Sequence, residues 1–262
     1  MNLDSKTFSL PPLPKEHGAW GVFVGAFLSA AAVLGSLGLA QLLLFLALGT
    51  FYLAHPTLIL LSRRKARRND VLWSALFFLM GVLFIIRASS TYRPIILYSL
   101  IVVPFAISEI LFIHRRKRQT LHAQAIGVTG LSSIAPLSMV LHERELTWGA
   151  AVLWTVTFCF FMSGILFARF QIARLNARSH PDVSCRRERG TIVVYHLVVA
   201  GMLVWLVLKT QVTVFSTVVF LPATAVSLLA AAKIFPSTAI RYTGWLIVAQ
   251  TILFVLLLAV VT

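Results

Sequence analysis

The chain has 262 residues, of which 59% are hydrophobic and 12% are charged, and its 23 Lys and Arg residues outnumber its 8 Asp and Glu residues, for a formal net charge of +15. Soluble domains carry about 25% charged residues, so this composition excludes an ordinary soluble protein and predicts one polytopic membrane domain, residues 1–262. The cations gather in short loops without interleaved aromatic residues, which excludes nucleic acid as a partner.

Runs of about 17–25 apolar residues can cross a bilayer as helices. The expected fold is therefore an all-α integral membrane protein, a bundle of nine transmembrane helices. A short cytoplasmic segment, residues 1–16, precedes them; its first 13 residues are polar and contain prolines, so no secretory signal is predicted. The predicted spans cover residues 18–37, 39–61, 71–87, 94–113, 121–141, 148–168, 191–208, 211–232 and 243–261.

The positions of the cations predict the orientation of these spans. With the N-terminus in the cytoplasm, the cytoplasmic segments hold all Lys and Arg residues except Arg87, Arg93, Arg144 and Lys209. Cytoplasmic loops of membrane proteins favour cations, so we expect a bacterial inner-membrane protein with a periplasmic or extracellular C-terminus. The basic runs RRKARR and HRRKR then contact anionic lipid headgroups.

Ionisable side chains inside or at the mouth of these spans predict a polar pocket. Such groups are costly in a bilayer and mark functional sites by default. All of them lie within roughly 12 Å of the predicted cytoplasmic boundary, at a rise of about 1.5 Å per residue. They are Glu16 and His17 in the segment PKEHGAW, His55 in the span 39–61, Glu109 in 94–113, His122 at the start of 121–141, and His196 beside Tyr195 in 191–208.

Glu109 is the leading candidate, because a carboxyl group at this depth must be protonated, paired or hydrated. Its expected partners are His17, His122, His196 or Arg169. An acid and a base in one pocket could exchange protons with a substrate, and the simpler alternative for Glu16 is a favourable position at a helix start. The candidate catalytic residues are Glu109, His17, Glu16 and His196, and the candidate substrate-binding residues are His122, Arg169, His55 and Tyr195.

No metal site and no cofactor are predicted. Cys159 lies in an apolar run and Cys185 in a basic loop, too far apart in sequence to suggest a disulfide or a metal site. After the span 148–168, Arg169, Arg174 and Arg178 recur at helical spacing and predict a basic helical extension. Such arginines could hold phosphate or diphosphate, or lipid headgroups.

Two predicted spans carry stripes of small residues. One stripe in the span 121–141 lines a cavity or hydrogen-bonds across a helix interface, and a second in the span 18–37 predicts close helix packing. At about 100° per residue, the first consists of His122, Ala125, Thr129, Ser133 and Pro136, and the second of Gly18, Gly21, Gly25 and Ser29.

The segment PKEHGAW, directly followed by the first span, resembles the YwiC-like family of bacterial membrane proteins. The likeness continues in SEILFIHRRKR, residues 108–118, and in PSTAIRYTGWLIVAQT, residues 236–251. This resemblance implies a multi-pass membrane topology rather than a particular activity.

The chain is also distantly similar to the UbiA prenyltransferase superfamily, in its nine spans, its orientation and its one-sided polar residues. That resemblance implies a UbiA-like site for an isoprenoid or a quinone. UbiA-type enzymes hold magnesium with two aspartate-rich motifs, whereas here the second span ends in HPTLILLSRRKARRND and the loop after the sixth offers Asp182. Magnesium needs several oxygen ligands, so Arg169 would hold a diphosphate instead.

Three classes of function follow from these patterns. The first is a lipid-binding or transferase-type protein with a cytoplasm-facing pocket. The second is a secondary transporter of a small solute, whose site would lie near the midplane, between repeated halves. The third is a structural or accessory membrane protein, in which the histidines have no chemical role.

Overall fold

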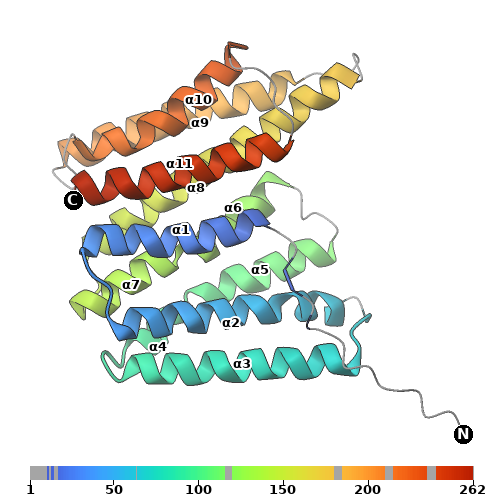
Figure 1. Ribbon diagram of the computed structural model, residues 1–262, viewed down its shortest axis with the longest axis vertical. Coiled ribbons are helices and arrows are strands. Elements are labelled where there is room, and N and C mark those ends of the chain that lie inside the picture. The colour runs from blue at the N-terminus through green and yellow to red at the C-terminus, as the bar shows by residue number, and fades with distance from the viewer. Residues whose placement is uncertain are drawn as a thin grey trace, which may run out of the picture. The chain divides into compact units, whose positions relative to one another are not determined.

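The computed structural model describes residues 11, 13–14, 17–62, 64–115, 120–179, 185–209, 215–234 and 240–261, and the regular structure within these ranges is helical (Figure 1). The helices are α1 His17–Leu34, α2 Leu39–Ser62, α3 Arg68–Ser89, α4 Ile95–Ser99, α5 Val102–His114, α6 Leu121–Ser132, α7 Ile134–Glu143, α8 Trp148–Ser179, α9 Arg186–Leu208, the 3-10 helix η1 Phe215–Phe220, α10 Leu221–Ala231 and α11 Ile240–Val261.

Within the described ranges, seven segments are long and apolar enough to cross a membrane. Two shorter apolar helices, Gly18–Leu34 and Thr217–Ala231, coincide with the two remaining predicted spans. The prediction of an all-α, multi-pass membrane protein is confirmed at this level, and the orientation stays a prediction. The seven segments are Leu39–Leu61, Arg68–Ser89, Ile95–His114, Leu121–Glu143, Trp148–Arg178, Arg186–Leu208 and Arg241–Val261.

Two spans that the sequence predicts as continuous are each interrupted three or four residues before a proline. Pro104 has no N–H for the carbonyl of Leu100, which instead accepts from the amide of Val103 at 3.0 Å, between α4 and α5. Pro136 likewise has no N–H for the carbonyl of Ser132, and at this junction of α6 and α7 the amide of Ser133 donates to the carbonyl of Gly130 at 3.4 Å. The expected stripe from His122 to Pro136 therefore does not follow one continuous helix.

The chain divides into two compact units. Unit 1 comprises Met1–His17 and Gly38–Gly127, and unit 2 comprises Gly18–Leu37 and Val128–Thr262. In unit 1, α2 packs against both α3 and α5. At the contact of α2 with α3, the rings of Phe51 and Phe78 lie 5.3 Å apart, and the absence of a side chain at Gly81 makes room for Phe51.

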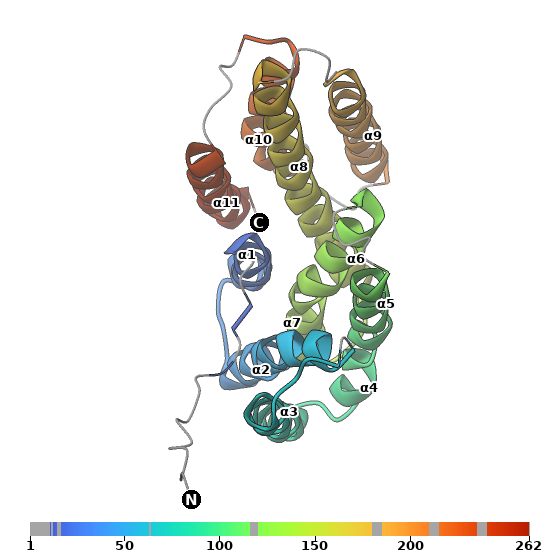
Figure 2. The ribbon, with the colours of Figure 1, turned by 90° about the vertical axis from the view of Figure 1, so that its right-hand side faces the viewer.

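In unit 2, the long helix α8 contacts α7, α9, α10 and α11, and Figure 2 shows it between α9 and α11. α1 also packs here, because a Cβ on Gly25 would lie 2.6 Å from Cζ of Phe161 and 2.8 Å from Cγ2 of Thr251. The predicted close packing is thus confirmed at Gly25. It is wrong for Gly18 and Gly21, where a Cβ would meet nothing within 4 Å.

α8 continues well past the predicted span 148–168, as far as Ser179. Its 32 residues give a length of about 48 Å, which exceeds the roughly 30 Å of a bilayer's hydrocarbon core. Arg169, Arg174 and Arg178 lie in the added turns, so the predicted basic extension is confirmed.

Candidate functional site

The described part of unit 1 holds a close acid–base pair between two apolar helices. Nε2 of His55, on α2, lies 3.7 Å from Oε2 of Glu109, on α5. The His55 side chain is 8% exposed and the Glu109 side chain 27% exposed. Pro56 follows His55 inside α2 and removes one backbone hydrogen bond from the helix at this depth. His55 therefore lies in a turn of α2 that has lost one of its backbone hydrogen bonds.

The geometry of this pair leaves hydrogen-bonding capacity unused. A distance of 3.7 Å is within ion-pair range but beyond that of a good hydrogen bond. Within the part of the chain that the structure describes, neither ring nitrogen of His55 has a hydrogen-bond partner. The ring of Tyr52, one turn earlier on α2, stacks near that of His55 with centroids 6.3 Å apart. An imidazole and a carboxyl group at this separation can bind a small polar group together, and a proton can pass between them through that group.

The partner of Glu109 differs from those that the sequence suggested. Within unit 1 it is His55, which the sequence assigned to substrate binding, whereas His122 is exposed near the start of α6. Glu16 and the side chain of His17 lie outside the described residues, so their place in the pocket stays a prediction.

Unit 2 contains a second buried polar pair, between α8 and α9. Oγ of Ser163 lies 2.9 Å from Nε2 of His196, and Nδ1 of His196 lies 2.7 Å from the carbonyl oxygen of Ile192. A carbonyl can only accept, so Nδ1 carries the hydrogen, and in the neutral imidazole Nε2 accepts from the Ser163 hydroxyl. Both hydrogen-bonding positions of the ring are thereby filled, which favours a role in holding the helices together.

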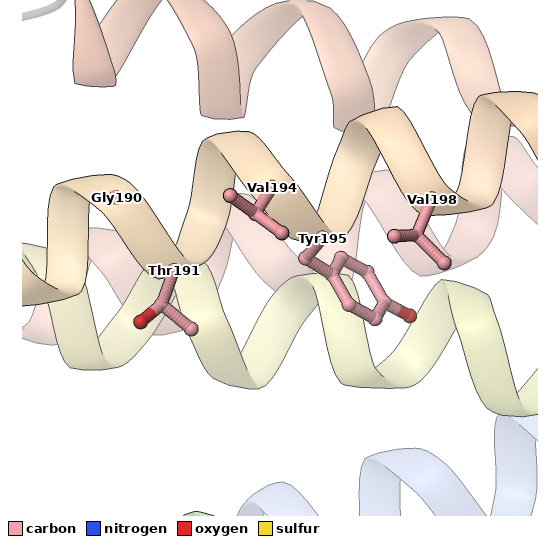
Figure 3. A pocket seen from close by; sticks show the side chains of 5 residues that line it. All are labelled: Gly190, Thr191, Val194, Tyr195 and Val198. Carbon is pink, nitrogen blue, oxygen red and sulfur yellow. The ribbon is translucent and has the colours of Figure 1, made fainter.

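Tyr195, beside His196, joins the same two helices. Its hydroxyl donates to the carbonyl oxygen of Cys159 at 2.7 Å, and its ring lines a hollow of about 450 Å³ along α9 (Figure 3). The other lining residues are Gly190, Thr191, Val194 and Val198. The sequence assigned Tyr195 and Arg169 to substrate binding; Arg169 is half-buried on α8.

Sequence reasoning missed Tyr52 and Ser163. Tyr52 precedes His55 by three residues, a spacing that places both on one face of a helix, so this signal was present. Ser163 gave no signal, because hydroxyl residues in apolar helices commonly bond to their own backbone, as Thr157 does to Leu153. No group of three His, Cys, Asp or Glu side chains among the described residues is arranged to hold a metal ion.

Residues 13–139 match a family model described as YwiC-like protein. No curated protein and no solved structure matches the chain. The matched segment contains both His55 and Glu109, whereas Ser163 and His196 lie beyond it. The His55–Glu109 pair of unit 1 thus lies within the matched segment.

Proposed function

We propose that the protein is a member of the YwiC-like family, whose model matches residues 13–139, and that it acts through the His55–Glu109 pair inside the matched segment. The protein is a multi-pass membrane protein. We place its N-terminus in the cytoplasm of a bacterial cell and its C-terminus outside. The pair then lies near the cytoplasmic face and binds the polar head of a membrane lipid of the isoprenoid or quinone class.

The observation that carries this proposal is the unequal exposure of the two partners. The His55 side chain is 8% exposed, whereas the Glu109 side chain, whose Oε2 lies 3.7 Å from Nε2 of His55, is 27% exposed. The carboxyl group of Glu109 is therefore open enough to meet a ligand. Imidazole and carboxyl groups together can donate to and accept from a hydroxyl or carbonyl group, and they can exchange a proton with it.

The charge of a lipid head group decides whether that head group suits a site beside Glu109. A diphosphate is an anion, and the carboxyl group of Glu109 offers it no positive charge when neutral and repels it when ionised, in a medium of low dielectric constant where charge interactions are strong. A neutral hydroxyl or quinone carbonyl has no such cost. The pair therefore favours an uncharged polar head over an isoprenyl diphosphate.

A second candidate function is transport of a small solute. It is favoured by the two interrupted spans, because discontinuous helices are typical of secondary transporters. The interruptions lie at Leu100–Ile101 and at Ser133. In this alternative, His55 and Glu109 carry the coupling proton.

Native mass spectrometry of gently purified protein tests the first proposal. We expect the wild type to carry a bound isoprenoid or quinone and Glu109→Gln to lose it at equal expression. Glu145→Gln is the matched control, because it removes an exposed carboxylate outside the apolar helices and should leave the adduct in place. The same adduct in wild type and Glu109→Gln would refute a ligand at this pair. An empty wild type together with proton-coupled uptake in proteoliposomes would instead favour transport.

A further inference from the structure

The hollow on α9 is lined by uncharged, mostly apolar residues, and arginines precede it on the same helix. Its lining residues lie between Gly190 and Val198, and Figure 3 shows Thr191, Val194, Tyr195 and Val198 along one side of the helix. The exposed residues Arg187 and Arg189 immediately precede it in the chain. The hollow thus begins where a positively charged turn gives way to an apolar helix.

One of these arginines shares the face of the hollow. At about 100° per residue, Arg187, Thr191, Val194 and Val198 fall within a narrow stripe. Side chains on a helix tilt toward its N-terminus, so the Arg187 guanidinium extends away from the apolar part of the stripe. This places a positive charge beyond the polar end of the hollow and keeps the rest of the stripe apolar.

The length of the stripe corresponds to the depth of one bilayer leaflet. From Arg187 to Val198 the helix rises about 16 Å, and half of a hydrocarbon core is about 15 Å. A molecule lying along this stripe would therefore place a charged head beside Arg187 and an apolar chain beside Val194 and Val198.

Tyr195 gives the hollow a fixed wall. Its hydroxyl donates a hydrogen bond to the carbonyl oxygen of Cys159 on α8. The ring is therefore fixed by its own backbone on α9 and by this bond, and it cannot rotate freely into the hollow. At the opposite edge, Gly190 contributes no side chain, and a Cβ there would meet nothing within 4 Å. The space between the ring and the glycine is thus open to the membrane.

We propose that this hollow is a binding site for one anionic phospholipid, whose phosphate contacts Arg187 and whose acyl chain lies along Thr191, Val194, Tyr195 and Val198. The charge of the arginine turn identifies an anionic rather than a zwitterionic head, and the apolar stripe of leaflet depth identifies a lipid chain rather than free phosphate. The site lies in unit 2 and is independent of the His55–Glu109 pair.

The test is native mass spectrometry from mixed micelles containing equal amounts of phosphatidylglycerol and phosphatidylcholine with identical chains. We expect the wild type to retain phosphatidylglycerol in preference to phosphatidylcholine. Arg187→Gln should weaken that preference by about fivefold, the effect of one cation near a lipid surface, and Arg187→Lys should keep it. Glu109→Gln should leave it unchanged, which separates this site from the proposed function.

A second pair of variants tests the apolar part of the site. Gly190→Leu fills the hollow, whereas Gly201→Leu adds the same side chain about 21 Å from Arg187 along the helix, beyond one leaflet. Both glycines are exposed and have space for a Cβ, so both variants should fold. We expect Gly190→Leu to lose the phosphatidylglycerol adduct and Gly201→Leu to retain it. Equal retention of the two lipids by the wild type, or an unchanged adduct in Gly190→Leu, would overturn the proposal.

Discussion

Ser163 on α8 and His196 on α9 are joined by a hydrogen bond of 2.9 Å between two side chains that are each 4% exposed. One turn earlier on α8, the carbonyl oxygen of Cys159 accepts from Tyr195 at 2.7 Å. Two adjacent residues of α9 therefore bind two successive turns of α8. Hydrogen bonds between membrane helices contribute modestly one at a time, but two neighbouring bonds fix the rotation of one helix against the other.

We expect Ser163→Ala to destabilise the protein by about 1–3 kcal/mol, because it leaves Nε2 of His196 buried without a donor. The measurement is the free energy of unfolding in mixed detergent micelles, followed by circular dichroism. Thr155→Ala is the control, since Thr155 is exposed on α8 and bonds to Ala151 of its own helix. Equal unfolding free energies of the two variants would show that the Ser163–His196 hydrogen bond contributes nothing measurable to stability.

A double-mutant cycle tests the pair in unit 1. We expect His55→Leu and Glu109→Leu to cost about 1–3 kcal/mol each, because each leaves one polar group facing an apolar partner. The double variant should cost less than the sum of the two, with a coupling of about 0.5–3 kcal/mol between groups in direct contact. Unfolding free energies in micelles measure this coupling. Additive losses would mean that the two side chains do not interact in the folded protein.

The packing of α1 predicts a difference between two glycines one turn apart. Gly25→Ala should destabilise the protein by about 1–3 kcal/mol, the usual cost of overpacking, because its Cβ would lie 2.6 Å from Phe161. Gly21→Ala should be tolerated, because a Cβ there meets nothing within 4 Å. The thermal unfolding midpoint in detergent compares the two variants. A loss of stability confined to Gly21→Ala would contradict the placement of α1.

The proposed orientation can be tested with the native cysteines. Cys185 is half-buried just before α9, and Cys159 is buried within α8. We expect a membrane-impermeant maleimide to label Cys185 in inside-out vesicles but not in intact cells, because its loop carries the cytoplasmic excess of arginines.

Cys185→Ser should abolish this labelling, because Cys159 is inaccessible. Arg144→Cys in that background should reverse the pattern and react from outside the cell. Labelling of Cys185 in intact cells would invert the proposed topology.

The helices were largely predictable from the sequence because each depends on local composition. Apolar runs of sufficient length gave the spans, whereas the interruptions at Leu100–Ile101 and at Ser133, shortly before Pro104 and Pro136, were not predicted. The end of α1 was harder to predict. The predicted span runs to residue 37, but the helix ends at Leu34, and Gly35 adopts a φ of 66°, which suits a helix terminus.

The candidate site could be predicted only in part, for a physical reason. The cost of an ionisable group in a membrane singled out His55 and Glu109 one by one. Their pairing depends on how α2 and α5 are rotated about their axes, which no local pattern encodes. Ser163 could not be found at all, since its bond to His196 replaces the common bond of a serine to its own helix.

The packing of α1 has a consequence for biosynthesis. α1 emerges from the ribosome early, yet it contacts Phe161 and Thr251, near the other end of the chain. At a synthesis rate of about 5–20 residues per second, the roughly 230 residues between Gly25 and Thr251 take about 10–45 s to make. Phe161 is made partway through that interval, but α1 has to persist in the membrane without its contact to Thr251 until the interval ends. If synthesis stalls before α11 is made, α1 therefore lacks the surface of α11 against which Gly25 packs.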